Sequence, residues 1–146
     1  MSKQEDVNKF WMKRHLALFD LSRDPQKIGR QVYDVLVRKG YNIYPINPNA
    51  ENIDSIVCYK SLDEIQQNLD GAVIITNLKI SLEVVKKCHQ NNINDLWFRL
   101  DTMDEKVKAF LKEKGMDYIY SCVLLHHREV GLPHSWHRFF YRLFQR

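Results

Sequence analysis

The sequence predicts an α/β domain with three layers, in which helices cover both faces of a mostly parallel sheet. Short apolar segments alternate with amphipathic segments of about ten residues, and parallel strands need crossover connections of this size. The length of 146 residues and the apolar content of 45% suit one globular core. We expect this domain over residues 1–130, followed by an aromatic and basic tail over residues 131–146 that forms a docked helix.

The first strand and helix form the clearest unit. An apolar run at residues 15–20 ends in polar residues and Pro25, which indicates a buried strand followed by a turn. Apolar residues then recur with the period of a helix that packs one face, and Gly40 ends this helix.

The later elements repeat the same alternation. Strands are predicted at residues 42–46, 56–59, 71–76, 96–98 and 117–122. One helix is expected over residues 81–91, and a second begins at a capping box of Thr102 and Glu105 and ends at Gly115. Six strands connected in this way predict a Rossmann-like sheet with the order 3-2-1-4-5-6.

Composition indicates a cytoplasmic protein that does not enter a membrane. No apolar run is long enough to cross a bilayer, and the charged first residues have no apolar segment behind them. Three widely spaced cysteines suit free thiols in a reducing compartment. The C-terminal histidines lack an acid or thiol at metal-ligand spacing, so we expect no metal site.

A ligand is expected at the carboxyl ends of the first and fourth predicted strands, where the strand order reverses. The loop over residues 20–29 opens a helix, whose free N–H groups and dipole attract phosphate, and it leads into the cations Arg23, Lys27 and Arg30. A glycine-rich dinucleotide fingerprint and a Walker loop are both absent from the sequence. The pattern therefore favours a nucleotide phosphate held in another way.

Residues 40–48 and residues 96–99 together resemble segments of the small CoA-binding proteins related to the first domain of the succinyl-CoA synthetase alpha subunit. Residues 40–48, Gly-Tyr-Asn-Ile-Tyr-Pro-Ile-Asn-Pro, are similar to that family's Gly-Tyr-x-Val-x-Pro-Val-Asn-Pro. Residues 96–99, Leu-Trp-Phe-Arg, are similar to its Leu-Trp-Phe-Gln, and the likeness spans residues 15–127.

The resemblance implies CoA or acyl-CoA as the ligand. Its phosphates would lie at the first loop, its adenosine beside residues 45–48, and the loop after Thr76 would cover the other side. The matching positions are Leu21, Ser22, Arg23, Lys27, Arg30, Pro45, Asn47, Pro48, Thr76 and Asn77.

The chain departs from this family at two loops. Asp20-Leu21-Ser22 stands where the family has Gly-Ala-Ser, and Arg99-Leu100-Asp101 stands where it has Gln-Pro-Gly. A carboxylate about 5 Å from a phosphate charge is repelled by roughly 3 kcal/mol at an effective dielectric constant of about 20. We therefore expect Asp20 to oppose an anionic ligand unless Lys27 or Arg30 offsets it.

These observations favour a non-catalytic binding module for CoA, acyl-CoA or a related adenine nucleotide over an enzyme, because no nucleophile is paired with a base. The alternative is a degenerate family member without nucleotide binding, which acts as a protein-interaction or oligomeric scaffold. Its tail could then join a second copy into a homodimer. Nucleic-acid binding is weaker as a hypothesis because the net charge is only +4.

Overall fold

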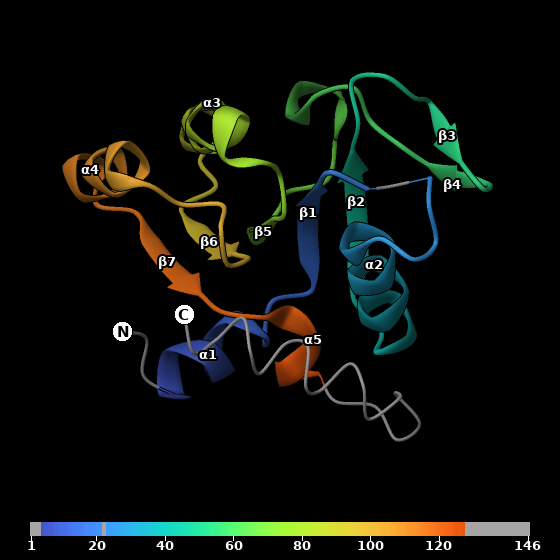
Figure 1. The fold of residues 1–146 in the computed structure, drawn as a ribbon, viewed down its shortest axis with the longest axis horizontal. Helices are drawn as coiled ribbons and strands as arrows, with labels where there is room; N and C mark the ends of the chain where they lie inside the picture. Colours follow the sequence, from blue (N-terminus) through green and yellow to red (C-terminus); the bar gives the residue numbers. More distant parts are fainter. Residues whose placement is uncertain (1–3, 22, 128–146) are drawn as a thin grey trace.

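A parallel sheet forms the centre of the molecule and confirms the predicted α/β class (Figure 1). The computed structural model describes residues 4–21 and 23–127. Within these residues the main sheet has five strands in the order β2-β1-β5-β6-β7, all paired in parallel. The strands are β1 (His15–Phe19), β2 (Asn42–Ile46), β5 (Gly71–Ile74), β6 (Asp95–Phe98) and β7 (Asp117–Tyr120).

The predicted order is correct except for its outermost strand. Residues 56–59 were expected to extend the sheet beyond β2, but they join it through a single bridge between Ile46 and Tyr59. Two residues of this segment, β4 (Ile56–Val57), instead pair antiparallel with β3 (Asn52–Ile53). A tight turn at Asp54 and Ser55, with φ of 48° and 68°, produces this hairpin, and a left-handed pair of turn residues is typical of two-residue hairpin loops.

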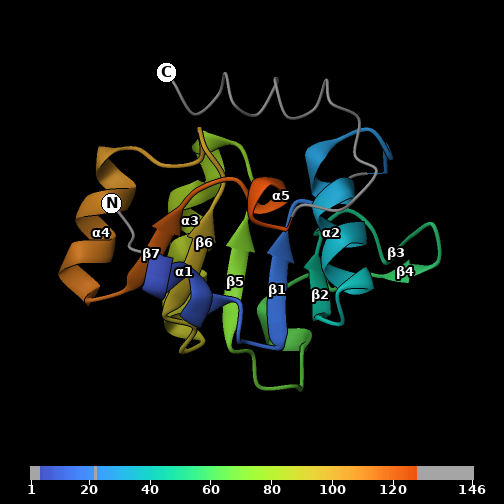
Figure 2. The ribbon, with the colours of Figure 1, turned by 90° about the horizontal axis from the view of Figure 1, so that it is seen from below.

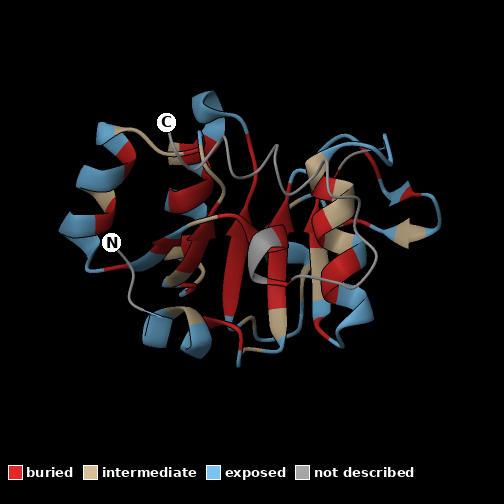
Figure 3. Ribbon diagram, turned by 60° about the horizontal axis from the view of Figure 1, so that its bottom comes forward, coloured by how far each residue is buried: buried red, intermediate tan, exposed pale blue. Residues whose placement is uncertain are grey.

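Helices cover both faces of the sheet, as predicted (Figure 2). Successive strand residues point to opposite faces, so Leu16 and Leu18 of β1 belong to one core cluster and Ala17 and Phe19 to the other. The first cluster lies under α1 (Gln4–Phe10), α2 (Ile28–Arg38) and α5 (Val123–His126). The second lies under α3 (Leu78–Gln90) and α4 (Glu105–Lys114), and the central strands are buried on both sides (Figure 3).

Capping side chains determine where α3 and α4 begin, and both starts differ from the predicted ones. Helix α3 begins at Leu78 rather than at Ser81, because Asn77 caps it by accepting a hydrogen bond from Lys79 N at 3.0 Å. The predicted Thr102 capping box is wrong. Asp104 caps α4 instead by accepting from Val107 N at 2.9 Å.

The short helix α1 was not predicted, and it brings aromatic residues onto the first face. Phe10 and Trp11 are buried, and the centroid of the Trp11 ring lies 4.7 Å from that of Trp97 and 4.2 Å from that of His127. Tyr41 donates its hydroxyl to Trp11 O at 2.5 Å. This aromatic cluster (Phe10, Trp11, Tyr41, Trp97, His127) therefore joins the two ends of the described chain.

Among the described helices, none is long and apolar enough to cross a lipid bilayer. The tail at residues 131–146, and with it the predicted docked helix, lies outside the described residues.

Candidate functional site

The candidate site lies at the carboxyl ends of β1 and β5, where the chain turns toward β2 on one side and toward β6 on the other. Open parallel sheets bind ligands at such a point because the loops that follow the two strands diverge there. The structure brings the loops after β1, β2 and β5 to this edge. They carry the residues that the sequence nominated.

The loop after β1 is pressed against the first turn of α2. A Cβ atom at Gly29 would lie 2.3 Å from Asp20 O, so only glycine fits at this position without a backbone shift. Asp20 itself has φ of 79°, in the left-handed region, and its side chain is exposed. Gly29 was not among the predicted site residues, although a glycine in the first turn of a helix that follows a strand was the available signal.

Leu21 contributes its backbone to this edge rather than its side chain. The side chain is only 1% exposed and belongs to the core under α2, while Leu21 O accepts a 3.4 Å hydrogen bond from Asn47 Nδ2. Ser22, which the sequence also nominated, lies outside the described residues.

The N-terminus of α2 is suited to an anion. Lys27 occupies the N-cap position with extended backbone, and among the described residues no side chain caps this end and no acid lies in the first turn. By contrast, Asn77 and Asp104 cap α3 and α4. Arg23 and Lys27 are exposed beside the helix end, so its free N–H groups and two cations lie together.

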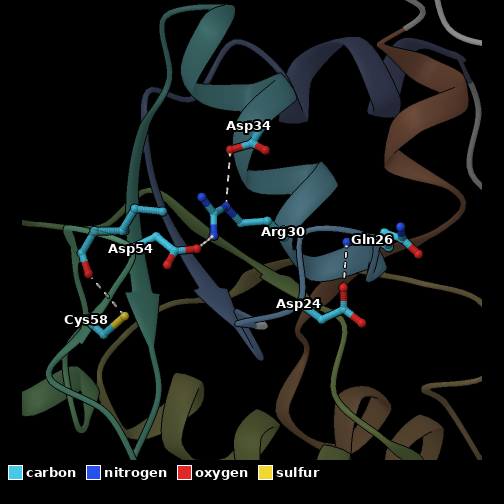
Figure 4. A network of polar contacts seen from close by, with 7 residues as sticks. Asp24, Gln26, Arg30, Asp34, Asp54 and Cys58 are labelled. Carbon is cyan, nitrogen blue, oxygen red and sulfur yellow. Dashed lines mark hydrogen bonds and ion pairs between the residues drawn. The ribbon is translucent and has the colours of Figure 1, made fainter.

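The structure places Arg30 in a network with acidic groups (Figure 4). Its Nη1 lies 2.6 Å from Asp54 Oδ2, and its Nε lies 3.5 Å from Asp34 Oδ1. The hydrogen bond to Asp54 raises the pKa of Arg30 above its usual value. In this arrangement carboxylates already balance the Arg30 charge. Arg30 is therefore less available to a phosphate than the exposed Arg23 and Lys27.

Asn47 organises the loop after β2. Its backbone N donates to Tyr59 O at 2.8 Å, its Oδ1 accepts from Asn49 N at 2.9 Å, and its Nδ2 reaches Leu21 O. Pro45 is buried at the end of β2 and Pro48 is exposed. Asn47 thus connects the loop after β2 with the loop after β1.

The loop after β5 forms the other side of the site. Thr76 is only 2% exposed, and its Oγ1 lies 3.2 Å from Ser81 Oγ, so its buried side chain joins the loop to the first turn of α3. Asn77 is committed to capping α3. Leu78 and Ile80 are 43% and 42% exposed and provide apolar surface on the first turn of α3.

The loop after β6 carries the second departure from the expected pattern. Asp101 has φ of 70°, and its N–H donates to the Tyr120 hydroxyl at 3.0 Å. Arg99 Nε is buried and lacks a hydrogen-bond partner within the described part of the chain. Like Asp20, Asp101 holds a backbone conformation that glycine adopts most easily.

The three cysteines are buried, and Cys58 and Cys88 lack the lowered pKa of an activated nucleophile. Burial raises the pKa of Cys58 above its ordinary value and that of Cys88 to about 12. A thiol becomes nucleophilic when its pKa is lowered, which is the opposite shift. The residues that the structure describes contain no group of three or more metal-ligating side chains.

Comparison with known proteins shows the family of this chain. Residues 14–128 match the CoA binding domain family. The ADP-forming acetate–CoA ligase II of Archaeoglobus fulgidus is 33% identical over 115 residues, which make up 77% of this chain but 16% of the ligase. The matched part of this chain spans less than a fifth of this ligase and of the alpha subunit of the ADP-forming acetate–CoA ligase II of Pyrococcus furiosus.

Solved structures show the same fold over most of the chain. A conserved hypothetical protein from Pyrococcus furiosus is 30% identical with a TM-score of 0.73, over 77% of this chain and 98% of that one. A hypothetical protein from Pyrococcus horikoshii has a TM-score of 0.79 at 21% identity, over 87% of this chain and 90% of that one. Sequence, fold and the arrangement of loops at the sheet edge together establish that this chain belongs to the CoA binding domain family.

Proposed function

We propose that this chain is a non-catalytic binding module for CoA, acyl-CoA or a related adenine nucleotide. The observation that carries the proposal is the N-terminus of α2, which among the described residues has no side-chain cap and no acid in its first turn, and which lies beside the exposed Arg23 and Lys27. Helix N-termini with free N–H groups and nearby cations bind phosphate. Membership of the CoA binding domain family specifies which phosphate compound to test.

The rest of the edge supports the same ligand class. Asn47 and Pro48 lie after β2, on the side where an adenosine would rest, and Leu78 and Ile80 offer apolar surface to a pantetheine arm or acyl chain. Burial raises the pKa values of Cys58 and Cys88, which disfavours either thiol as a nucleophile for acyl transfer. These shifts support a binding role without catalysis.

The decisive experiment measures thermal stability with CoA, dephospho-CoA, ADP and NAD, together with native mass spectrometry of the purified protein. A ligand at about 100 times its dissociation constant stabilises the folded state by about 2.7 kcal/mol. We expect CoA to raise the melting temperature most. Lys27→Ala should weaken this effect, whereas Lys39→Ala, which removes an exposed cation at the other end of α2, should leave it unchanged. If none of these compounds stabilises the protein at millimolar concentration, the proposal is wrong.

Asp20 favours a second candidate, a degenerate module that acts as a protein-interaction or oligomeric scaffold. Its carboxylate stands at the loop where the ligand phosphates are expected. If this charge excludes nucleotides, the remaining function lies in protein contacts, including the predicted homodimer contact through the tail. Deleting residues 135–146 should then change the mass measured by light scattering, and an unchanged mass would contradict the tail-mediated dimer.

A further inference from the structure

Arg30 joins two elements through one guanidinium. Its side chain is only 15% exposed and binds two carboxylates (Figure 4). Asp34 lies one turn further along the same helix, so that contact stays within α2. Asp54 lies at the turn of the β3–β4 hairpin, so the 2.6 Å contact ties this hairpin to α2.

Two kinds of contact hold the hairpin, namely buried side chains on its inner side and the ion pair at its turn. Each of its strands has two residues, and an isolated ribbon of this length is not stable in water. Its inner side is anchored by Ile53 and Cys58, which are buried in the core under α2. Its turn, formed by Asp54 and Ser55, is exposed, and the ion pair with Arg30 is the contact that secures it among the hydrogen bonds and ion pairs of the described residues.

The hairpin continues directly from the candidate site. The chain leaves β2 at Asn47, forms the hairpin, and returns to β2 at Tyr59, where Tyr59 N donates to Pro45 O and Asn47 N donates to Tyr59 O, each at 2.8 Å. Within this excursion Cys58 N donates to Glu51 O at 2.8 Å. Residues 47–50 connect β2 to the hairpin, and the hydrogen bonds of Asn47 and the one between Cys58 N and Glu51 O hold the two ends of this segment.

We propose that Arg30 is a positioning residue that, by binding Asp54, fixes the β3–β4 hairpin on α2 and with it residues 47–50, the wall of the site on the adenosine side. The part that concerns the ligand rests on the proposed function. This role differs from direct phosphate binding, because the guanidinium stays with the hairpin when the site is filled.

The two carboxylates of Arg30 provide a matched pair of variants. Asp54→Asn and Asp34→Asn each remove one carboxylate charge beside the same guanidinium, but only Asp54→Asn releases the hairpin. If Arg30 positions the wall, Asp54→Asn weakens CoA binding by about threefold to tenfold, in line with a partly buried ion pair, and Asp34→Asn leaves it within about twofold. If Arg30 binds phosphate directly, both variants free its charge and both tighten binding.

Hydrogen exchange tests the positioning role without any ligand. We expect amides of residues 49–58 to exchange faster in Asp54→Asn than in the parent protein or in Asp34→Asn, while amides of β1 and β5 stay equally protected. Arg30→Lys keeps a charge but not the forked geometry, so it should fall between the parent and Asp54→Asn in both measurements.

Each outcome decides between the alternatives. If the hairpin amides exchange at an unchanged rate in Asp54→Asn, Arg30 does not fix the hairpin. If they exchange faster but the CoA affinity is unaltered, the hairpin does not position the site. Tighter binding in both aspartate variants overturns the positioning role in favour of a phosphate contact. If the parent protein binds no CoA or nucleotide at all, the proposed function fails, while the exchange data still decide whether Arg30 holds the hairpin.

Discussion

Asp20 illustrates how one residue can influence a site through both its backbone and its charge. Its φ of 79° lies where L-residues other than asparagine and aspartate are rare, and its carbonyl oxygen is held against Gly29. The conformation therefore suits glycine, which the related family has at this position. The sequence revealed the altered charge, but the strained backbone became visible only in the structure.

Asp20→Gly and Asp20→Asn separate the two effects. Asparagine tolerates the left-handed conformation and carries no charge, so both substitutions should tighten CoA binding, by about tenfold or more if the carboxylate opposes phosphate at close range. Asp20→Gly should also raise the free energy of unfolding, by less than about 1 kcal/mol. Isothermal titration calorimetry and urea unfolding measure the two quantities. Equal CoA affinity in all three proteins would show that the carboxylate does not oppose the ligand.

The positions of the nominated residues were predictable where a residue directly follows a strand or begins a helix. Arg23, Lys27, Asn47 and Asn77 all lie at the sheet edge at which the sequence placed them. Arg30 was nominated for its charge, and its pairing with Asp54 could not be foreseen because it depends on a hairpin that the sequence did not indicate. Leu21 was nominated as a site residue, yet its side chain faces the core.

At the level of elements, strands and helices were predictable from periodicity, and their partners were less so. Residues 56–59 have the apolar character of a strand, but register and partner depend on the turn before them. Helix α1 was not predicted because most of its residues are charged or polar. Its short apolar side is recognisable only from the packing of Phe10 against Trp97. The starts of α3 and α4 depended on which of several polar residues acts as the cap.

The cap of α4 can be tested directly. Asp104→Ala should lower the free energy of unfolding by about 1 kcal/mol, because the N–H of Val107 loses its acceptor and the helix dipole loses a favourable charge. Glu105→Ala, which removes the acid of the predicted capping box, serves as the control and should cost less than about 0.5 kcal/mol. Urea denaturation compares the two. An equal loss in both variants would indicate that the helix end responds to charge alone.

For the molecule as a whole, buried protonated groups predict a loss of stability at alkaline pH. The unfolded chain releases the Cys88 proton near the ordinary pKa of 9.0, whereas burial keeps the pKa of the folded state at about 12. The unfolded state therefore binds fewer protons in this interval, and the contribution of Cys88 is complete below about pH 9 and declines as the pH rises toward about 12. Burial also raises the pKa of Tyr41, which acts in the same direction.

Urea unfolding at about pH 8 and about pH 10 measures this slope, which approaches 1.4 kcal/mol per pH unit for each such group. Cys88→Ala should be less stable at both values because it leaves a cavity, but its stability should fall less between them. Identical slopes in the two proteins would show that burial does not raise the pKa of Cys88 in the folded state.

The aromatic cluster has a consequence for synthesis on the ribosome. Trp11 is translated before both of its ring partners, because Trp97 lies in β6 and His127 directly follows α5. Since domains complete their folding once the required chain has left the exit tunnel, this face of the sheet stays open to chaperones and proteases until His127 has been synthesised and has left the tunnel. Nascent chains stalled before α5 should accordingly be cleaved more readily near α1 than chains that include His127.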